Sequence, residues 1–191
     1  MRGLLTKNHP HLTVEIVVPE EPVDTHIVWI LGETIPALPI STDLIILLDT
    51  SLLSRTKLPT EAFQSYSVIS IDHHESFPDA VPGYRDSTTP SNTIILTEMA
   101  EILGWTIDAA TATALLLGIY TDTGGFIHRN TDARALSTAA RLLGLGGDQS
   151  AIAQRTFGGY SLDYLHQLGG GLLAIEVVDN VAILCLPSGI E

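Results

Sequence analysis

The chain has 191 residues, of which 45% are hydrophobic and only 16% charged, enough apolar material for one folded domain with the start of a second. Its apolar stretches are far shorter than the roughly 20 residues of a membrane span, and the first ten residues lack the long apolar stretch of a signal peptide. The single cysteine excludes an internal disulfide framework and a multi-cysteine zinc site, so we expect a soluble protein of the reducing cytoplasm.

The chain is strongly acidic, with 22 acidic residues against 9 basic ones and a formal net charge of −13. Non-specific affinity for long nucleic acid comes from basic side chains that release counterions. We therefore expect no binding to long nucleic acid. A phosphate-containing substrate would have to be short or be met by a bound cation.

Four apolar runs in the first part of the chain predict strands. They cover residues 12–18, 26–31, 43–50 and 67–73. The last two are nearly continuous apolar runs, which is typical of strands buried on both faces of a parallel sheet. The 17 residues from 50 to 66 between them have about the length of a parallel crossover.

The hydrophobic period becomes helical in the middle of the chain. The predicted helices begin at Pro90-Ser91, at Thr106 and at Thr131-Asp132. Gly104 ends the first of them. The second extends to residue 121 and is apolar on nearly all sides, so we expect it to be buried.

The last part of the chain combines helical and strand signals. Residues 148–168 have a helical pattern, the glycines at 169–171 break it, and a β-hairpin turns at Asp179-Asn180. Strands that alternate with helices favour an α/β fold with a mostly parallel sheet flanked by helices. The expected organisation is a first domain over 1–147, a helical linker over 148–171 and the beginning of a second domain over 172–191.

Acidic and imidazole side chains lie where two of the predicted strands end. Asp49 comes at the carboxyl end of one strand, and Asp72-His73-His74 at the carboxyl end of the next. Ligands of open α/β sheets bind beyond these ends, so the groups should converge if the strands are neighbours. Carboxylate oxygens and imidazole nitrogens without thiolate suit a divalent ion such as manganese or magnesium.

A third polar stretch follows the buried helix. Asp122 opens the sequence "DTGGF", in which Gly124 and Gly125 let the backbone turn sharply and approach a substrate closely. Each feature also has a simpler interpretation, because an aspartate can cap a turn, two histidines can be an exposed polar turn and glycines can stop a helix. On the pattern alone, both interpretations stay open.

Three stretches resemble successive motifs of the DHH phosphoesterase superfamily. They are "DLIILLDTS", "VISIDHHES" and "GIYTDTGGFIHRNT", within a region from about Asp43 to Leu143. The last is most similar to the branch of oligoribonucleases (nanoRNases) that also dephosphorylate 3′-phosphoadenosine 5′-phosphate. The resemblance implies a manganese-dependent phosphodiesterase and phosphomonoesterase that hydrolyses short oligonucleotides or nucleotide phosphates.

The resemblance also implies roles for individual residues. Asp49 would bridge two manganese ions, and His73 and Asp122 would be ligands of one of them, with magnesium as an alternative metal. His74 would face the substrate phosphate, and Asp72 would orient the histidines. Such ions would bind the phosphate of the substrate, a role that basic side chains would otherwise fill.

The chain departs from the family at both ends. A motif with one histidine and two aspartates has no counterpart before Asp49, and the glycines at 169–171 lack the histidine of the family's Gly-Gly-Gly-His motif. We therefore expect a chain truncated at both ends, with one metal ion or none and little or no activity. A missing first strand predicts poor solubility or a second chain that covers the gap, such as a homodimer partner. A cyclic-dinucleotide phosphodiesterase and a non-catalytic module that binds nucleotides or a partner remain alternatives.

Overall fold

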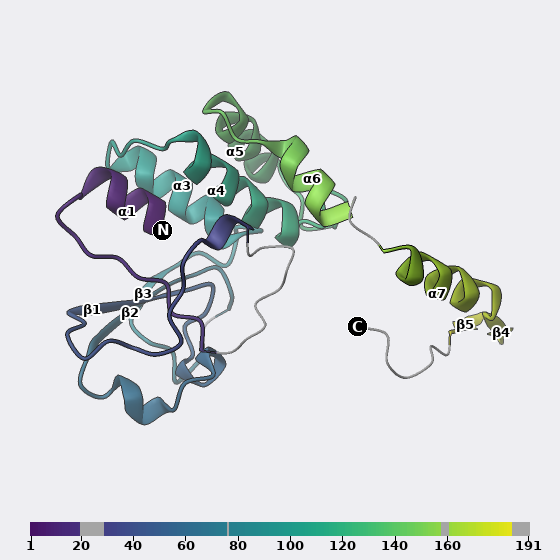
Figure 1. Cartoon of the computed structure of the whole chain (residues 1–191), viewed down its shortest axis with the longest axis horizontal. Helices are drawn as coiled ribbons and strands as arrows, with labels where there is room; N and C mark the ends of the chain where they lie inside the picture. Colours follow the sequence, from purple (N-terminus) through teal and green to yellow (C-terminus); the bar gives the residue numbers. More distant parts are fainter. Residues whose placement is uncertain (20–28, 76, 158–160, 185–191) are drawn as a thin grey trace. The chain divides into compact units, whose positions relative to one another are not determined.

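A parallel sheet organises the first of the two units into which the chain divides, Met1–Ile152 and Ala153–Glu191. The computed structural model describes residues 1–19, 29–75, 77–157 and 161–184. Among these residues the sheet has three parallel strands in the order β1-β2-β3 (Figure 1). The strands are β1 Leu44–Leu48, β2 Ser67–Asp72 and β3 Gly83–Arg85. The predicted α/β class with a parallel sheet flanked by helices is confirmed.

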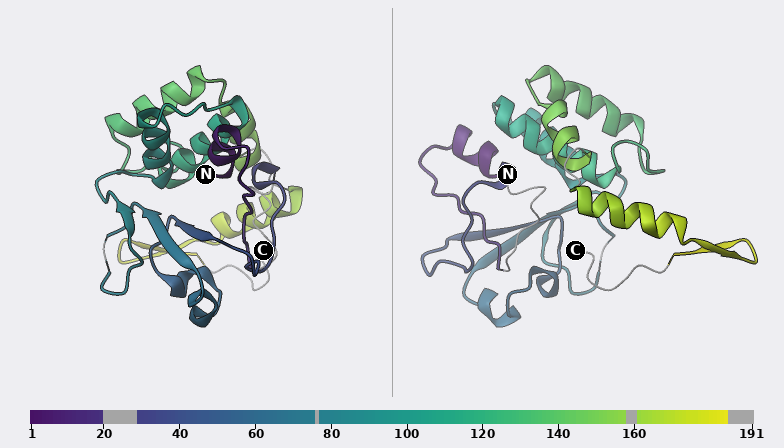
Figure 2. Two further views of the ribbon diagram at one scale, coloured as in Figure 1. Left: turned by 90° about the vertical axis from the view of Figure 1, so that its left-hand side faces the viewer. Right: turned by 45° about the vertical axis from the view of Figure 1, so that its right-hand side comes forward.

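The sheet is covered on both faces. Ile45 and Leu47 of β1 pack with Phe63 in one apolar cluster, whereas Ile46 and Ile71 belong to the cluster formed with the helices. This alternation follows from the two-residue period of a strand. In Figure 2 the 3₁₀-helices η1 Leu53–Thr56 and η2 Thr60–Phe63 lie on one side of the sheet, and the long α-helices of the first unit lie on the other.

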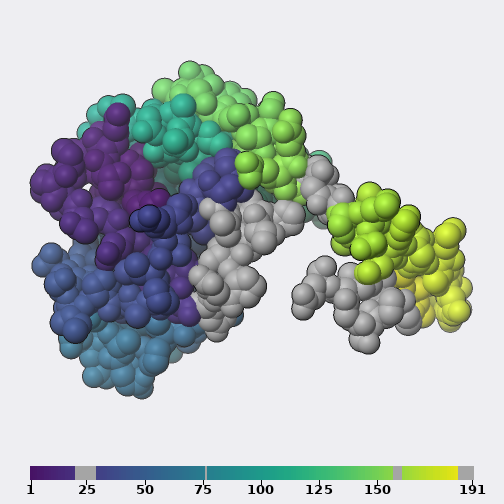
Figure 3. Space-filling model, viewed as in Figure 1, coloured from purple at the N-terminus to yellow at the C-terminus, as the bar shows by residue number. Residues whose placement is uncertain are grey.

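Helix α4 is the centre of the helical layer. Its bounds and those of its neighbours are α1 Arg2–Asn8, α3 Asn92–Ile102, α4 Ala109–Asp122 and α5 Ala133–Gly144. The helix packs against the other three, and most of its side chains are buried, as its nearly uniform apolar composition predicts. Figure 3 shows α1 lying against this layer. Its Leu4 is fully buried.

Helices α6 Gln149–Phe157 and α7 Leu162–Leu173 follow, and a hairpin ends the described chain. Strand β4 Glu176–Val178 pairs antiparallel with β5 Val181–Ile183. The turn residues Asp179 and Asn180 have φ of 48° and 65°, as the sequence predicts for a two-residue hairpin turn. The proposed domain limits stay a prediction, and residues 185–191 of the last one lie outside the described residues. No helix in the described ranges is long and apolar enough to cross a membrane.

Two predicted strands are wrong. Residues 12–18 form a single bridge from Val17 to Ile35. Prolines follow both partners closely, at positions 19 and 36, and proline cannot donate to a ladder. Residues 29–31 of the predicted strand 26–31 form a helical turn, and 26–28 lie outside the described residues.

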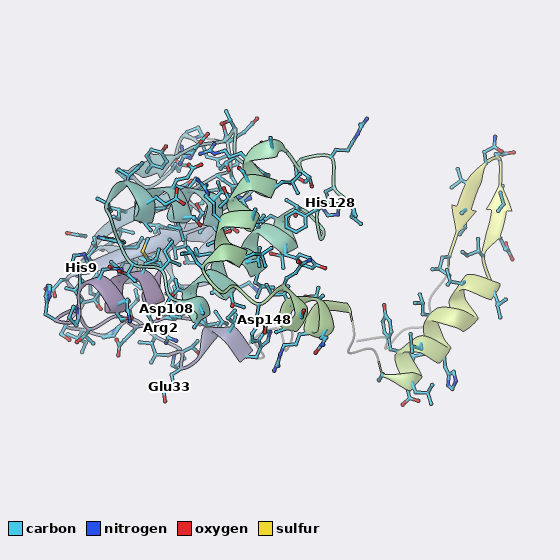
Figure 4. All side chains as sticks on the ribbon, turned by 90° about the horizontal axis from the view of Figure 1, so that it is seen from above. Arg2, His9, Glu33, Asp108, His128 and Asp148 are labelled. Carbon is cyan, nitrogen blue, oxygen red and sulfur yellow. The ribbon has the colours of Figure 1, made fainter. Side chains whose placement is uncertain are left out.

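A long-range contact explains the helical turn. Arg2, which lies beside Glu33 in Figure 4, donates hydrogen bonds from its guanidinium to the carbonyls of Leu31 and Glu33 at 2.6 and 2.9 Å. These bonds close the turn where Gly32 takes a φ of 68°. The local hydrophobic pattern cannot predict a hydrogen bond between residues that are 29 positions apart in the sequence.

Two helix limits also differ from the prediction. The cap of α4 is Asp108, whose Oδ1 accepts from the amide of Thr111 at 2.9 Å, while the amide of Thr106 donates to Asn8 Oδ1 at 2.8 Å. The glycines at 169–171 do not break α7, which Ser161 caps through the amide of Tyr164. Glycine lowers helix propensity by about 1 kcal/mol but permits helical dihedrals.

Close packing of α3 on α4 gives a test of this layer. A Cβ added at Gly118 would lie 2.8 Å from Thr93 Oγ1 and nearer still to its Cγ2, whereas a Cβ at Gly144 would meet nothing within 4 Å. We predict that Gly118→Ala lowers the free energy of unfolding by about 1–3 kcal/mol because of overpacking. Gly144→Ala should be neutral or stabilising. Urea unfolding checks both, and equal stabilisation by the two variants would contradict this packing.

Candidate metal centre

Asp49 follows β1 directly, in a conformation that few residues tolerate. Its φ is 63°, in the left-handed region that aspartate visits more readily than most side chains. Its amide still donates to the carbonyl of Ile71 at 3.1 Å, so the backbone turns only after the ladder is complete. This turn leaves the carboxylate half-exposed at the carboxyl end of the sheet.

His73 follows β2 and is fixed through both ring nitrogens. Its Nδ1 lies 3.2 Å from the carbonyl of Thr89, and its Nε2 lies 3.1 Å from Asp49 Oδ1. Since a carbonyl only accepts, Nδ1 carries a proton, which leaves Nε2 as the metal-binding nitrogen. The bond to Asp49 raises the pKa of His73 against the opposing effect of burial. A positive group is therefore favoured beside Asp49.

Asp72 ends β2 beneath the second imidazole. Its side chain is 1% exposed, and its Oδ1 accepts from the amide of His74 at 3.1 Å and from Nδ1 of the same residue at 2.8 Å. Burial opposes ionisation, but these bonds hold the pKa of Asp72 below its usual value. The carboxylate thus orients the ring of His74 through Nδ1.

Asp122, which the sequence places after the helix, is the last residue of α4. Burial raises the pKa of this carboxyl, as does the charge of Asp49, while a hydrogen bond with Ser91 and the two imidazoles lower it. The two carboxylates are thus close enough to repel one another. A divalent cation would relieve that repulsion.

Gly124 and Gly125 end α4. Their φ values are 58° and 69°, and their amides donate to the carbonyls of Thr121 and Tyr120 at 3.2 and 2.7 Å. A Cβ at Gly124 would collide with the imidazole of His128, an exposed residue in the loop that follows (Figure 4). The glycines therefore have a structural role, and their role toward a substrate stays a prediction.

The donor atoms of three residues converge. Asp49, His73 and His74 each place one ligand atom within 4.8 Å of the others, the one such group of three or more among the described residues. Oxygen and imidazole donors without thiolate fit manganese or magnesium. The predicted convergence of the two strand ends is thus present, with Asp122 beside the group and Asp72 behind it.

The chain is similar in sequence to two curated proteins of the same name. Over 115 residues the chain is 35% identical to a bifunctional oligoribonuclease and PAP phosphatase, NrnA, from Thermus thermophilus. The aligned region covers 58% of this chain and 34% of that relative. Over 78 residues it is 36% identical to the protein of the same name from Mycoplasma genitalium, covering 40% and 24% of the two chains. These matches support the resemblance of the chain to the DHH phosphoesterase superfamily.

The fold of the chain is also known from a solved structure. A crystal structure of an exopolyphosphatase-related protein from Bacteroides fragilis superposes with a TM-score of 0.69 at 23% identity, over 76% of this chain and 45% of that one. No protein-family model matches the chain. The chain spans about a third of the Thermus relative's length and a quarter of the Mycoplasma one's.

The sequence patterns did not predict the role of the loop at residues 86–91, which supports His73. Thr89 supplies the carbonyl bonded to His73, and Ser91 caps α3 and lowers the pKa of Asp122. Asp86 shapes the loop by accepting at Oδ1 from the amide and Oγ1 of Thr88 at 3.0 and 2.6 Å. The local signal was the polar run "DSTTPS" before the helix, since aspartate and threonine form such turns.

The carboxyl of Asp86 should contribute to stability in acid. Hydrogen bonds from Thr88 and from Arg134 lower its pKa from 3.8 to about 2. A carboxyl with a depressed folded-state pKa stabilises above its unfolded value, so this contribution, about 2 kcal/mol, is present above pH 4 and lost as the pH falls toward 2. We predict that Asp86→Asn shows a smaller loss of stability over that interval. Urea midpoints at pH 5, 4, 3 and 2.5 check this, and parallel curves for the two proteins would contradict it.

Proposed function

We propose that this centre hydrolyses phosphoesters with the help of bound manganese. The substrate class is short oligoribonucleotides or nucleotide phosphates such as 3′-phosphoadenosine 5′-phosphate. The observation that carries the proposal is the convergence of Asp49, His73 and His74 at the carboxyl ends of neighbouring parallel strands. The names of the two NrnA relatives support the substrate class.

Three side chains are suited to hold the metal. Asp49 and Asp122 supply carboxylates, and His73 supplies Nε2 because Thr89 accepts the proton of its other nitrogen. A divalent ion bound there acts as a Lewis acid toward a phosphoryl oxygen and activates water for attack. Asp49 carries the greatest weight, because its charge acts on both His73 and Asp122.

Two residues serve the substrate in this proposal. His74 is partly exposed, and its Nδ1 bonds the buried carboxylate of Asp72, so that its Nε2 lies on the opposite side of the ring. Such an imidazole can donate to a phosphate oxygen or transfer a proton. The backbone at Gly124 and Gly125 would line the substrate's approach. Asp72 acts through His74 and stays ionised because of the bonds it accepts.

The number of donors sets the number of ions. Two six-coordinate ions need about twelve ligand positions, and many of them are filled by water and substrate. Asp49 and His73 with Asp122 supply protein ligands for one such ion. We therefore propose one manganese ion per chain and, for the 191-residue chain, at most a residual rate of hydrolysis.

Manganese binding is the first prediction. Calorimetric titration of the chain should show one site, and Asp49→Asn should weaken its affinity at least about 100-fold, because the partners of metal ligands alone contribute 10–100-fold. Asparagine tolerates the left-handed backbone of Asp49, so the variant tests the charge. Asp43→Asn, at the amino end of the same strand, should bind as the wild type does. Absence of binding in the wild type would reject the proposed centre.

Hydrolysis is the second prediction. Phosphate release from 3′-phosphoadenosine 5′-phosphate and mononucleotide release from a ribonucleotide pentamer are measured with manganese and with EDTA, beside the NrnA relative from Thermus thermophilus. The chain should be far slower than that relative, and His74→Asn should reduce any manganese-dependent rate about 100-fold. His166→Asn, in the second unit, is the control.

The outcomes of this assay separate the alternatives. A rate equal to the relative's would contradict the proposed ligand count. Tight manganese binding without manganese-dependent release on either substrate would favour a non-catalytic module over an enzyme.

A further inference from the structure

One arginine joins three elements beside the metal centre. Arg134, in the first turn of α5, donates from Nε and Nη2 to the two carboxylate oxygens of Glu98 on α3 at 2.8 and 2.6 Å. Its Nη1 donates to Asp86 Oδ2 at 2.7 Å. The three side chains are only 19–31% exposed. Charge-assisted bonds in this forked geometry are stronger and more directional than those of an ordinary surface ion pair.

The arginine holds the connection between β3 and α3, residues 86–91. The Asp86 amide donates to the carbonyl of Asp72 at 3.2 Å, so the start of this connection is tied to the end of β2. The Asp86 carboxylate is divided between two tasks. Its Oδ1 folds the connection through Thr88, and its Oδ2 takes the bond from Arg134.

The same connection orients one proposed metal ligand and lies beside another. The carbonyl of Thr89 accepts from Nδ1 of His73, and the hydroxyl of Ser91, fully buried, lies near enough to Asp122 to lower the pKa of that carboxyl. His73 directly follows β2, whereas Asp122 is the last residue of α4. The conformation of residues 86–91 therefore decides whether the ring of His73 points its Nε2 toward the other donor atoms.

We propose that Arg134 is a positioning residue of the metal centre: by clamping Asp86 to α3, it fixes the carbonyl of Thr89 and thereby the ring of His73. The inference about the ring stands on the metal-free protein. Its consequence for metal affinity rests on the proposed function.

A second ion pair on the same helices supplies a matched control. Arg141 of α5 and Glu101 of α3 lie 3.1 Å apart further along the two helices, with side chains 46% and 39% exposed. Replacing either arginine by glutamine removes one positive charge and one α3–α5 link. Only Arg134 also contacts Asp86, so a general loss of helix packing should affect both variants alike.

The test compares Arg134→Gln, Arg134→Lys and Arg141→Gln. In metal-free protein, the proton on Nδ1 of His73 is followed in ¹⁵N-correlated imidazole spectra, with His73→Asn used for assignment. We expect a slowly exchanging signal in the wild type and Arg141→Gln and its loss in Arg134→Gln. Arg134→Lys, which keeps the charge but cannot reproduce the fork, should retain a weakened signal.

Manganese affinity is the second readout. The dissociation constant should rise about 10–100-fold in Arg134→Gln, the range found for partners of metal ligands, and less than twofold in Arg141→Gln. Melting temperatures of the two glutamine variants show whether both remain folded. If Arg134→Gln does not fold, Arg134→Lys and Asp86→Asn carry the comparison.

The outcomes distinguish this inference from the proposed function. An unchanged His73 signal in Arg134→Gln, or equal changes in both glutamine variants, would overturn the positioning role. A wild-type chain that binds no manganese would reject the proposed metal centre, and the His73 signal would then decide the positioning role alone.

Discussion

Negative charge held at the end of a parallel sheet is the constraint on which the site depends. Asp49 and Asp122 approach closely enough that the charge of one raises the pKa of the other. In the metal-free chain, Asp49 is balanced by the imidazole of His73, whose pKa rises in response. Protonation of that ring and binding of a divalent cation therefore compete, because each compensates the negative charge of the same carboxylates. The metal affinity of such a site should therefore depend on pH.

The sheet and its connections hold the charged side chains of the site in defined positions. Strands β1 and β2 pair so that Leu48 lies opposite Ile71, which brings Asp49 and His73 to the same carboxyl end of the sheet. The left-handed turn at Asp49 then places its carboxylate beside His73. The connection from β3 to α3 then fixes the ring of His73 from the other side. Rigid elements carry the charged atoms, and hydrogen bonds from one short loop set their directions.

Local sequence patterns predicted the side chains of the candidate metal centre but not the hydrogen bonds that hold them in place. Asp49 and His73 could be placed together because both directly follow apolar strands, and parallel strands end on one side. Arg134 could not be connected to Asp86, 48 positions earlier, because no local pattern encodes that separation. The wrong strand at 26–31 has the same origin, since Arg2 closes the helical turn from far along the chain. Long-range polar contacts are what the patterns lacked.

The overall charge of the chain narrows the substrates that such a site could serve. With a net charge of −13, a long polyanion would be repelled along most of its length, because few lysines or arginines are present to release its counterions. A short nucleotide suffers this repulsion only near the site, where a bound cation would reverse the sign of the potential. Arg134, one of the 9 basic residues, is engaged with Asp86 and Glu98 rather than with solvent. In a site of this kind, attraction for phosphate depends on the metal, so metal affinity and substrate affinity should fall together when the support of His73 is removed.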